Sequence, residues 1–115
     1  MRKKGFKGRC EKRVLSKSKD VVRTYDEIQY VYADILEKSN EVKEIRCNVP
    51  LDELTESEYM SDFVCVKENG DLMVRECVFR KHLTKPLTVK LLDMSREYWL
   101  KRGVMDWGIV IDEEK

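Results

Sequence analysis

The sequence predicts an α/β domain in which a mixed β-sheet lies between helices. The chain has 115 residues, close to the commonest size of one domain and enough for one core. The spacing of its apolar residues is typical of a helix early in the chain and alternates through the middle. It is then typical of a helix again and finally of a strand. The expected order is a helix, a three-stranded meander, a helix and a strand, which is typical of the mixed α/β class.

The first half of this order starts with a helix that follows Thr24 and runs to about Lys38, with Ser39-Asn40 as its end. Five apolar residues at spacings of three and four form one stripe along it: Ile28, Val31, Tyr32, Ile35 and Leu36. From Val42 to Leu51 the pattern alternates, which predicts a half-buried strand that ends near Pro50. Residues 52–58 are expected to form an acidic loop.

The second half begins with a strand from Tyr59 to Lys67 and a return strand from Leu72 to Phe79. Glu68-Asn69-Gly70-Asp71 between them is a hairpin turn sequence. Pro86 is expected to begin a helix that runs to about Arg102 and ends at Gly103. Three of its residues are expected to face the core: Val89, Leu92 and Trp99. The last strand, Asp106 to Asp112, is expected to return parallel to its neighbour, as strand-helix-strand connections do.

Charge is distributed unevenly along the chain, although the net charge is only +1. Residues 1–19 form a basic arm, expected to be flexible, ahead of a single domain over residues 20–115. The arm contains one acid, Glu11, and nine basic residues: Arg2, Lys3, Lys4, Lys7, Arg9, Lys12, Arg13, Lys17 and Lys19. Such an arm on an acidic body favours contact with double-stranded DNA, and a solvated tail is the alternative. Arg80 and His82 are further candidates for DNA contact.

The four cysteines, Cys10, Cys47, Cys65 and Cys77, are widely spaced and argue against a structural zinc site. Three of them fall in apolar strand-like runs, where a free cysteine acts as a small core residue. No window approaches the length of a membrane span, and the first ten residues have no apolar stretch typical of a signal peptide. The prediction is a cytoplasmic protein with reduced thiols that does not contact a membrane.

Three carboxylates, Glu27, Asp62 and Glu76, are placed where a buried acid is costly unless it is hydrogen-bonded, ion-paired or bound to a cation. Carboxylates gathered at one sheet edge would suit Mg²⁺. Two alternatives stay open: Glu27 is three residues after Thr24 and would complete a capping box, and Glu76 would pair with a basic residue across the strand.

The hairpin register decides whether two of these acids share a face. A two-residue loop at Asn69-Gly70 would pair Asp62 with Cys77 and leave Glu76 on the other face. A three-residue loop with a bulged glycine would pair Asp62 with Val78, and would put Asp62 and Glu76 on the same face. The turn sequence favours the bulged form, and the metal hypothesis requires it.

Four segments, taken in order, resemble the TnsA family of transposon-end endonucleases, a branch of the PD-(D/E)xK nucleases. They are Tyr25-Asp26-Glu27 before a helix, Tyr59-Met60-Ser61-Asp62-Phe63, Val74-Arg75-Glu76-Cys77-Val78, and Arg96-Glu97-Tyr98-Trp99 with Arg102-Gly103-Val104 and Trp107-Gly108-Ile109-Val110. The resemblance covers residues 18–112 and implies a restriction-endonuclease-like core.

By this resemblance, Glu27, Asp62 and Glu76 would hold Mg²⁺ or Mn²⁺ beside a scissile phosphate, and metal-activated water would cut DNA at transposon ends. Such a subunit of a mobile genetic element works beside a transposase or recombinase subunit of a different fold. These roles are what the resemblance to the family implies.

One departure from the family bears on catalysis. Two residues after Glu76, where the family has lysine, the chain has Val78, which can neither orient water nor screen developing charge. Lys81 and Lys90 are the candidates to supply that cation from the loop or the next helix. The alternative is a catalytically inactive nuclease fold that is kept for binding DNA or a partner.

Overall fold

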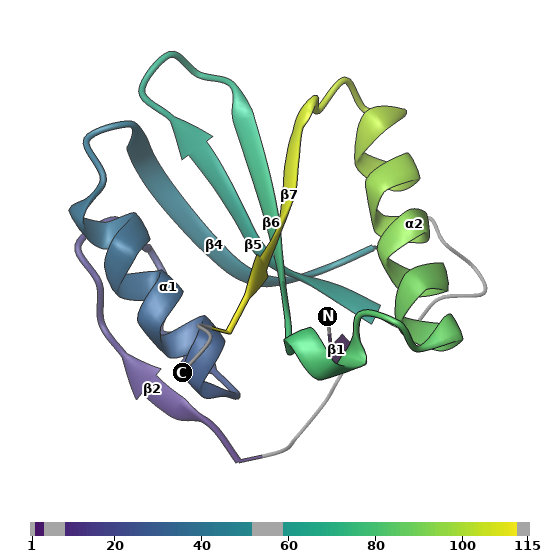
Figure 1. Cartoon of the computed structure of the whole chain (residues 1–115). Coiled ribbons are helices and arrows are strands. Elements are labelled where there is room, and N and C mark those ends of the chain that lie inside the picture. The colour runs from purple at the N-terminus through teal and green to yellow at the C-terminus, as the bar shows by residue number, and fades with distance from the viewer. Residues whose placement is uncertain (1, 4–8, 52–58, 113–115) are drawn as a thin grey trace.

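The computed structural model describes residues 2–3, 9–51 and 59–112 (Figure 1). Its elements in chain order are β1 (Arg2–Lys3), β2 (Glu11–Arg13), β3 (Val22–Thr24), α1 (Glu27–Lys38), β4 (Val42–Pro50), β5 (Tyr59–Lys67), β6 (Leu72–Val78), the 3₁₀ turn η1 (Arg80–His82), α2 (Pro86–Leu100) and β7 (Asp106–Ile111). The expected acidic loop at 52–58 lies outside the described residues.

The main sheet is mixed, as the sequence predicts. Strands β4, β5 and β6 form an antiparallel meander, and β7 returns parallel to β6. The short β1 pairs antiparallel with the start of β5, while β2 and β3 form a separate two-stranded sheet. The mixed α/β class is therefore confirmed.

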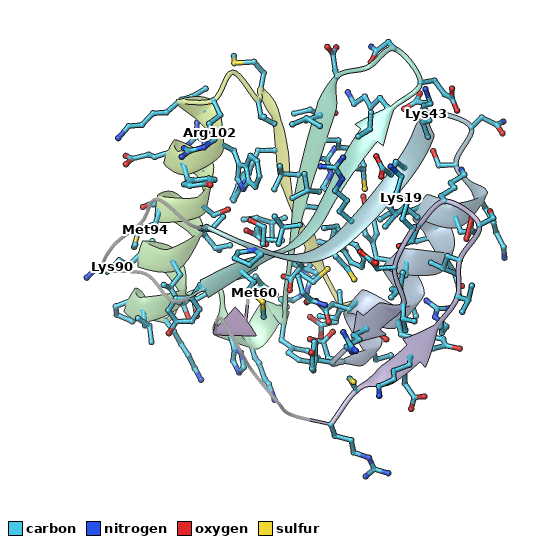
Figure 2. All side chains as sticks on the ribbon, turned by 180° about the vertical axis from the view of Figure 1, so that it is seen from behind. Lys19, Lys43, Met60, Lys90, Met94 and Arg102 are labelled. Carbon is cyan, nitrogen blue, oxygen red and sulfur yellow. The ribbon has the colours of Figure 1, made fainter. Side chains whose placement is uncertain are left out.

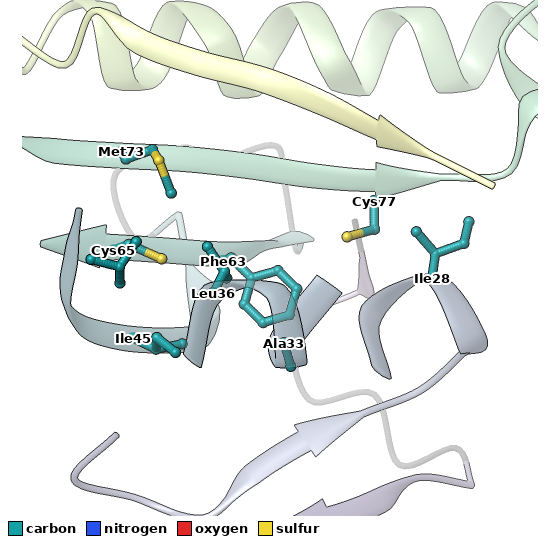
Figure 3. Close-up of a cluster of buried hydrophobic side chains, with 9 residues drawn as sticks. Ile28, Ala33, Leu36, Ile45, Phe63, Cys65, Met73 and Cys77 are labelled. Carbon is teal, nitrogen blue, oxygen red and sulfur yellow. The ribbon is translucent and has the colours of Figure 1, made fainter. Parts of the chain in front are cut away.

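The two helices cover opposite faces of the main sheet (Figure 1). Between α1 and the sheet lies the larger cluster of buried side chains, shown in Figure 3, which includes Ile28, Leu36, Phe63, Cys65 and Cys77. Between α2 and the sheet lies a second cluster: Leu51, Val64, Val74, Tyr98, Trp99 and Val104. The sheet is thus buried on both faces, and Cys65 and Cys77 are free thiols in the core, as expected.

Helix α1 begins at Glu27, and its N-cap is Asp26, whose Oδ1 accepts a hydrogen bond of 2.9 Å from Gln29 N. The alternative in which Glu27 completes a capping box with Thr24 is therefore wrong, because Thr24 belongs to β3 and Asp26 takes the cap position. The predicted stripe is also rotated: Val31 and Ile35 are about half exposed, and Gln29 is buried in their place.

The β5–β6 hairpin has a three-residue loop with Gly70 at φ 92°, which is the bulged form. Gly70 N donates to Lys67 O at 2.9 Å, and Lys67 N donates to Asp71 O at 2.8 Å. The register differs from the predicted one by two residues, since Phe63 lies opposite Arg75 and Asp62 therefore lies opposite Glu76. The predicted pairing of Asp62 with Val78 is wrong, but Asp62 and Glu76 lie directly opposite each other on adjacent strands.

Part of the basic arm contacts the body of the domain. Arg13 donates to Asp34 Oδ1 at 2.6 Å and stacks on the ring of Tyr30. Lys17 Nζ donates to the carbonyl oxygens of Leu36 and Ser39 at the end of α1, at 3.3 and 2.5 Å. Residues 1 and 4–8 of the arm lie outside the described residues.

Helix α2 begins at Pro86, as predicted, and buries Leu92, Ser95, Tyr98 and Trp99 against the sheet. The predicted inward position of Val89 is wrong, because this residue is 44% exposed and the buried stripe starts one turn later. No helix in the described ranges is long and apolar enough to cross a membrane.

Candidate functional site

Asp62 on β5 and Glu76 on β6 lie side by side in the middle of the sheet and are both buried, with 1% and 0% of their surface exposed. The ladder of paired backbone residues ends one residue earlier, at Phe63 and Arg75. Beyond it the side chains join the strands: Asp62 N donates to Glu76 Oε1, and Cys77 N donates to Asp62 Oδ2, both at 2.7 Å. The two carboxylates therefore replace backbone acceptors where the strands separate.

Gln29 of α1 binds Asp62 from the other side. Its Nε2 donates to Asp62 Oδ1 at 2.6 Å, and its Oε1 accepts from Tyr25 N at 2.7 Å. The second bond fixes which end of the amide faces Asp62. Gln29 thus connects the start of α1 to the centre of the sheet.

Glu76 is held by hydroxyl groups. Its Oε2 accepts from Ser61 Oγ at 2.9 Å and from Ser95 Oγ of α2 at 2.5 Å. Each serine in turn accepts from an indole: Trp99 Nε1 donates to Ser61 at 2.9 Å, and Trp107 Nε1 donates to Ser95 at 3.1 Å. Two chains of hydrogen bonds therefore end on one carboxylate oxygen.

The pKa of Glu76 is raised from its ordinary value of 4.5 to about 7. Burial is the main cause, and the negative charge of Asp62 is the second. The hydrogen bonds from Ser95 and from the backbone of Asp62 oppose this shift. Near neutral pH, Glu76 therefore exchanges between a carboxylate and a neutral acid.

The prediction that the two acids share a face is wrong, because they lie opposite each other on adjacent strands but point toward different helices. Asp62 contacts Gln29 on α1, whereas Glu76 contacts Ser95 on α2. The usual alternation along β5 is broken here, because Asp62 and the next residue, Phe63, both face α1. Opposite Asp62 on β4 lies Asn48, whose φ of 52° is rare for a residue with a side chain.

The third predicted ligand, Glu27, is exposed on the first turn of α1. It borders two surface grooves, one beside Cys10 and Tyr30 and one beside Val31 and Val110. Within residues 9–51 and 59–112 no three His, Cys, Asp or Glu side chains are grouped closely enough to hold a metal ion.

The four carboxylate oxygens of Asp62 and Glu76 each accept a hydrogen bond from a protein donor. A divalent cation would have to displace these donors, so the residues do not fit the implied metal in this arrangement.

The family's lysine position is filled by buried Val78, which is 8% exposed. Lys81 is exposed on η1, with its Nζ 5.7 Å from the centre of the Phe79 ring. Lys90 is exposed on α2 and points away from the sheet (Figure 2). Neither candidate lysine contacts Asp62 or Glu76 through any bond between described residues.

The sequence matches no family model and no curated protein. The resemblance to TnsA-like endonucleases therefore stays a prediction.

The predicted DNA-binding residues fall into three groups. Arg9, Lys12, Lys19 and Arg80 are exposed, whereas Arg13 and Lys17 bind groups of the protein itself. The side chains of Arg2 and Lys3, and all of Lys4 and Lys7, lie outside the described part of the chain.

His82, another predicted DNA contact, is half-buried, with its ring edge-on to Phe79 at 5.9 Å between centres. Loss of water contact and then the charges of Lys85 and Lys81 lower its pKa, which favours the neutral ring. A neutral imidazole attracts phosphate less than the exposed arginines and lysines do.

Sequence reasoning missed the residues that hold the two acids: Gln29, Ser61, Ser95 and the indole groups of Trp99 and Trp107. One pattern could have found two of them. Ser95 and Trp99 are four residues apart on a helix, so they share the face that turns inward.

Proposed function

We propose that this chain is a catalytically inactive, nuclease-like DNA-binding domain, an accessory subunit of a mobile genetic element that works beside a transposase or recombinase. The TnsA-like order of segments in the sequence supports the class of element, and the basic arm supports DNA as the ligand.

The observation that carries this proposal is the hydrogen bonding of Asp62 and Glu76. Both acids are buried and fully bonded to protein donors, so they stabilise the sheet where β5 and β6 separate. Val78 supplies no cation beside them. A hydrolytic site needs exposed oxygens for metal, water and phosphate, and these groups offer none.

A metal-dependent endonuclease, with Mg²⁺ or Mn²⁺ as cofactor, is the second candidate, and one observation favours it. Burial and then the charge of Asp62 raise the pKa of Glu76, and the second of these causes is repulsion between two neighbouring carboxylates. A cation between them would relieve this repulsion, provided that Ser95 and Gln29 released their bonds.

The test combines DNA binding with cleavage on the full chain. A labelled duplex is titrated with protein over a series of salt concentrations, and supercoiled plasmid is incubated with protein and Mg²⁺ or Mn²⁺. The proposal expects salt-dependent binding without nicking. Nicking that disappears in Asp62→Ala would contradict the inactive assignment, and absence of binding at low salt would contradict the DNA-binding one.

A further inference from the structure

We infer that the groove along the outer edge of β4 binds the sugar–phosphate backbone of duplex DNA, with Arg23 and Arg46 as its main phosphate contacts. The inference rests on the proposed DNA binding and names the surface responsible for it. Neither arginine belongs to the basic arm from which the sequence predicted that binding.

The groove lies between the turn at residues 18–21 with β3 on one side and β4 on the other. It extends to Pro50 and Met60, at the start of β5, and its volume is about 860 Å³. This is in the upper part of the range of ~300–1,000 Å³ typical of ligand pockets. The groove follows β4 from Glu44 to Pro50, so it suits an extended chain better than a compact molecule.

Three cations line the groove: Lys19, Arg23 and Arg46. Two acids also line it, and one of them, Glu44, lies between Lys19 at 3.8 Å and Arg46 at 3.2 Å. The other acid, Asp20, is exposed. Basic side chains therefore exceed acidic ones along this wall, and the exposed side chain of Val21 is available to contact sugar rings.

The basic side chains are available to a ligand. Side-chain exposure is 86% for Lys19 and 57% for Arg46, and Arg23 is also exposed. Within the described ranges the guanidinium of Arg23 has no hydrogen-bond or ion-pair partner. Arginine suits phosphate because its planar group donates two parallel hydrogen bonds.

Asn48 on β4 holds β3 against β4 along the groove. Its Nδ2 donates to the carbonyl oxygen of Arg23 at 2.8 Å, and its Oδ1 accepts a long bond of 3.5 Å from Gln29 Nε2. Gln29 also binds Asp62, so the groove and the buried acids share one hydrogen-bonded support. The positive φ of Asn48 is the kind of strained conformation that persists only where its surroundings fix it.

Figure 2 shows where a control can be placed. Lys19 lies on the β4 side of the molecule, whereas Lys90 lies on α2, on the other side. Both are exposed lysines, so they differ mainly in position relative to the groove. Lys90→Ala therefore removes one charge without touching the proposed surface.

The experiment measures the affinity of the full chain for a labelled duplex at several salt concentrations. Arg23→Ala and Arg46→Ala should each weaken binding about tenfold near 0.1 M salt and lower the slope of log affinity against log salt by about 0.9. Glu44→Gln should strengthen binding about threefold, because it removes an acid from the groove. Circular dichroism checks that each variant is folded, and Lys90→Ala should leave the slope unchanged.

The outcomes separate this inference from the proposed function. If the native chain binds and both arginine variants keep its slope, the groove assignment is wrong and DNA binding stands. An equal loss in Lys90→Ala would also overturn the groove, because general charge would then explain binding. If the native chain does not bind at low salt, the proposed function fails as well.

Discussion

Asp62 and Glu76 lie opposite each other on neighbouring strands, yet the groups that hold them differ in kind. From the described part of the chain, Asp62 accepts from two N–H groups, one on the Gln29 side chain and one on the backbone of Cys77. Glu76 accepts from one backbone N–H and two serine hydroxyls. An N–H of fixed orientation can only donate, whereas a hydroxyl can rotate and accept instead.

This difference determines how each site responds to loss of charge. At Asp62, each of the two donors needs its own acceptor oxygen. A neutral side chain at this position, with only one acceptor oxygen, would leave one donor unpaired. Around Glu76, rotation of Ser61 and Ser95 allows the site to hold a neutral group, in agreement with its raised pKa. The surroundings of Asp62 therefore require an acceptor at both oxygens, whereas those of Glu76 tolerate protonation.

Asp62→Asn should have the largest effect on the free energy of unfolding. The NH₂ of the new amide would face one of two N–H donors, the side chain of Gln29 or the backbone of Cys77. The unpaired donors should lower the free energy of unfolding by about 3 kcal/mol. Urea denaturation measures the change, and Asp93→Asn, at an exposed site on α2, is the control. Equal stability of the two variants would show that the donors of Gln29 and Cys77 do not need both oxygens of Asp62.

Gln29→Leu should have a smaller effect. The substitution removes one donor from Asp62 and leaves Tyr25 N without its acceptor on α1. A loss of about 2 kcal/mol in the free energy of unfolding is expected, since buried charges depend on their donors. Gln29→Glu, which places a second carboxylate against Asp62, should be more destabilising than Gln29→Leu at pH 8. The reverse order would contradict the assigned orientation of the amide.

Glu76→Gln should be tolerated, and should change how stability depends on pH. Because the pKa of Glu76 is about 7 in the folded state and ordinarily 4.5, the folded state binds more protons between these values. Its contribution to the free energy of unfolding therefore decreases as pH rises through this window. Glu76→Gln lacks this decrease, so between pH 4.5 and 8 its free energy of unfolding should rise by about 3 kcal/mol relative to that of the native chain.

Urea denaturation at several pH values measures this gain, with Glu97→Gln at an exposed site as the control. Parallel pH profiles for Glu76→Gln and the native chain would mean that Glu76 keeps an ordinary pKa.

The smallest effect is spectroscopic. The chain has two tryptophans, and both indoles donate to serines that bind Glu76. Protonation of Glu76 should therefore shift tryptophan emission with a midpoint near pH 7. The transition should be absent in Glu76→Gln, and its persistence there would assign it to another group.

Much of the fold was predictable from the sequence because local patterns determine it. The turn at Gly70 and the proline at the start of α2 have backbone requirements that few other residues meet. The rotation of α1 was not predictable in the same way, since a stripe that includes Val31 and Ile35 permits more than one buried face.

The candidate site was predictable only in part. The cost of burying a carboxylate indicated Asp62 and Glu76, but the cost is the same whether a metal or a protein donor offsets it. The donors are distant in sequence: Gln29 is 33 residues from Asp62, and Ser95 is 19 from Glu76. Only the packing of both helices on the sheet brings them together.

The most direct test of the central claim is a calorimetric titration of the native chain with Mn²⁺, alongside Asp62→Asn and Glu76→Gln. If internal hydrogen bonds satisfy both acids, the native chain and the two variants should give the same heats, with no saturable binding. Binding of one ion per chain that disappears in both variants would contradict the account and make Asp62 and Glu76 metal ligands.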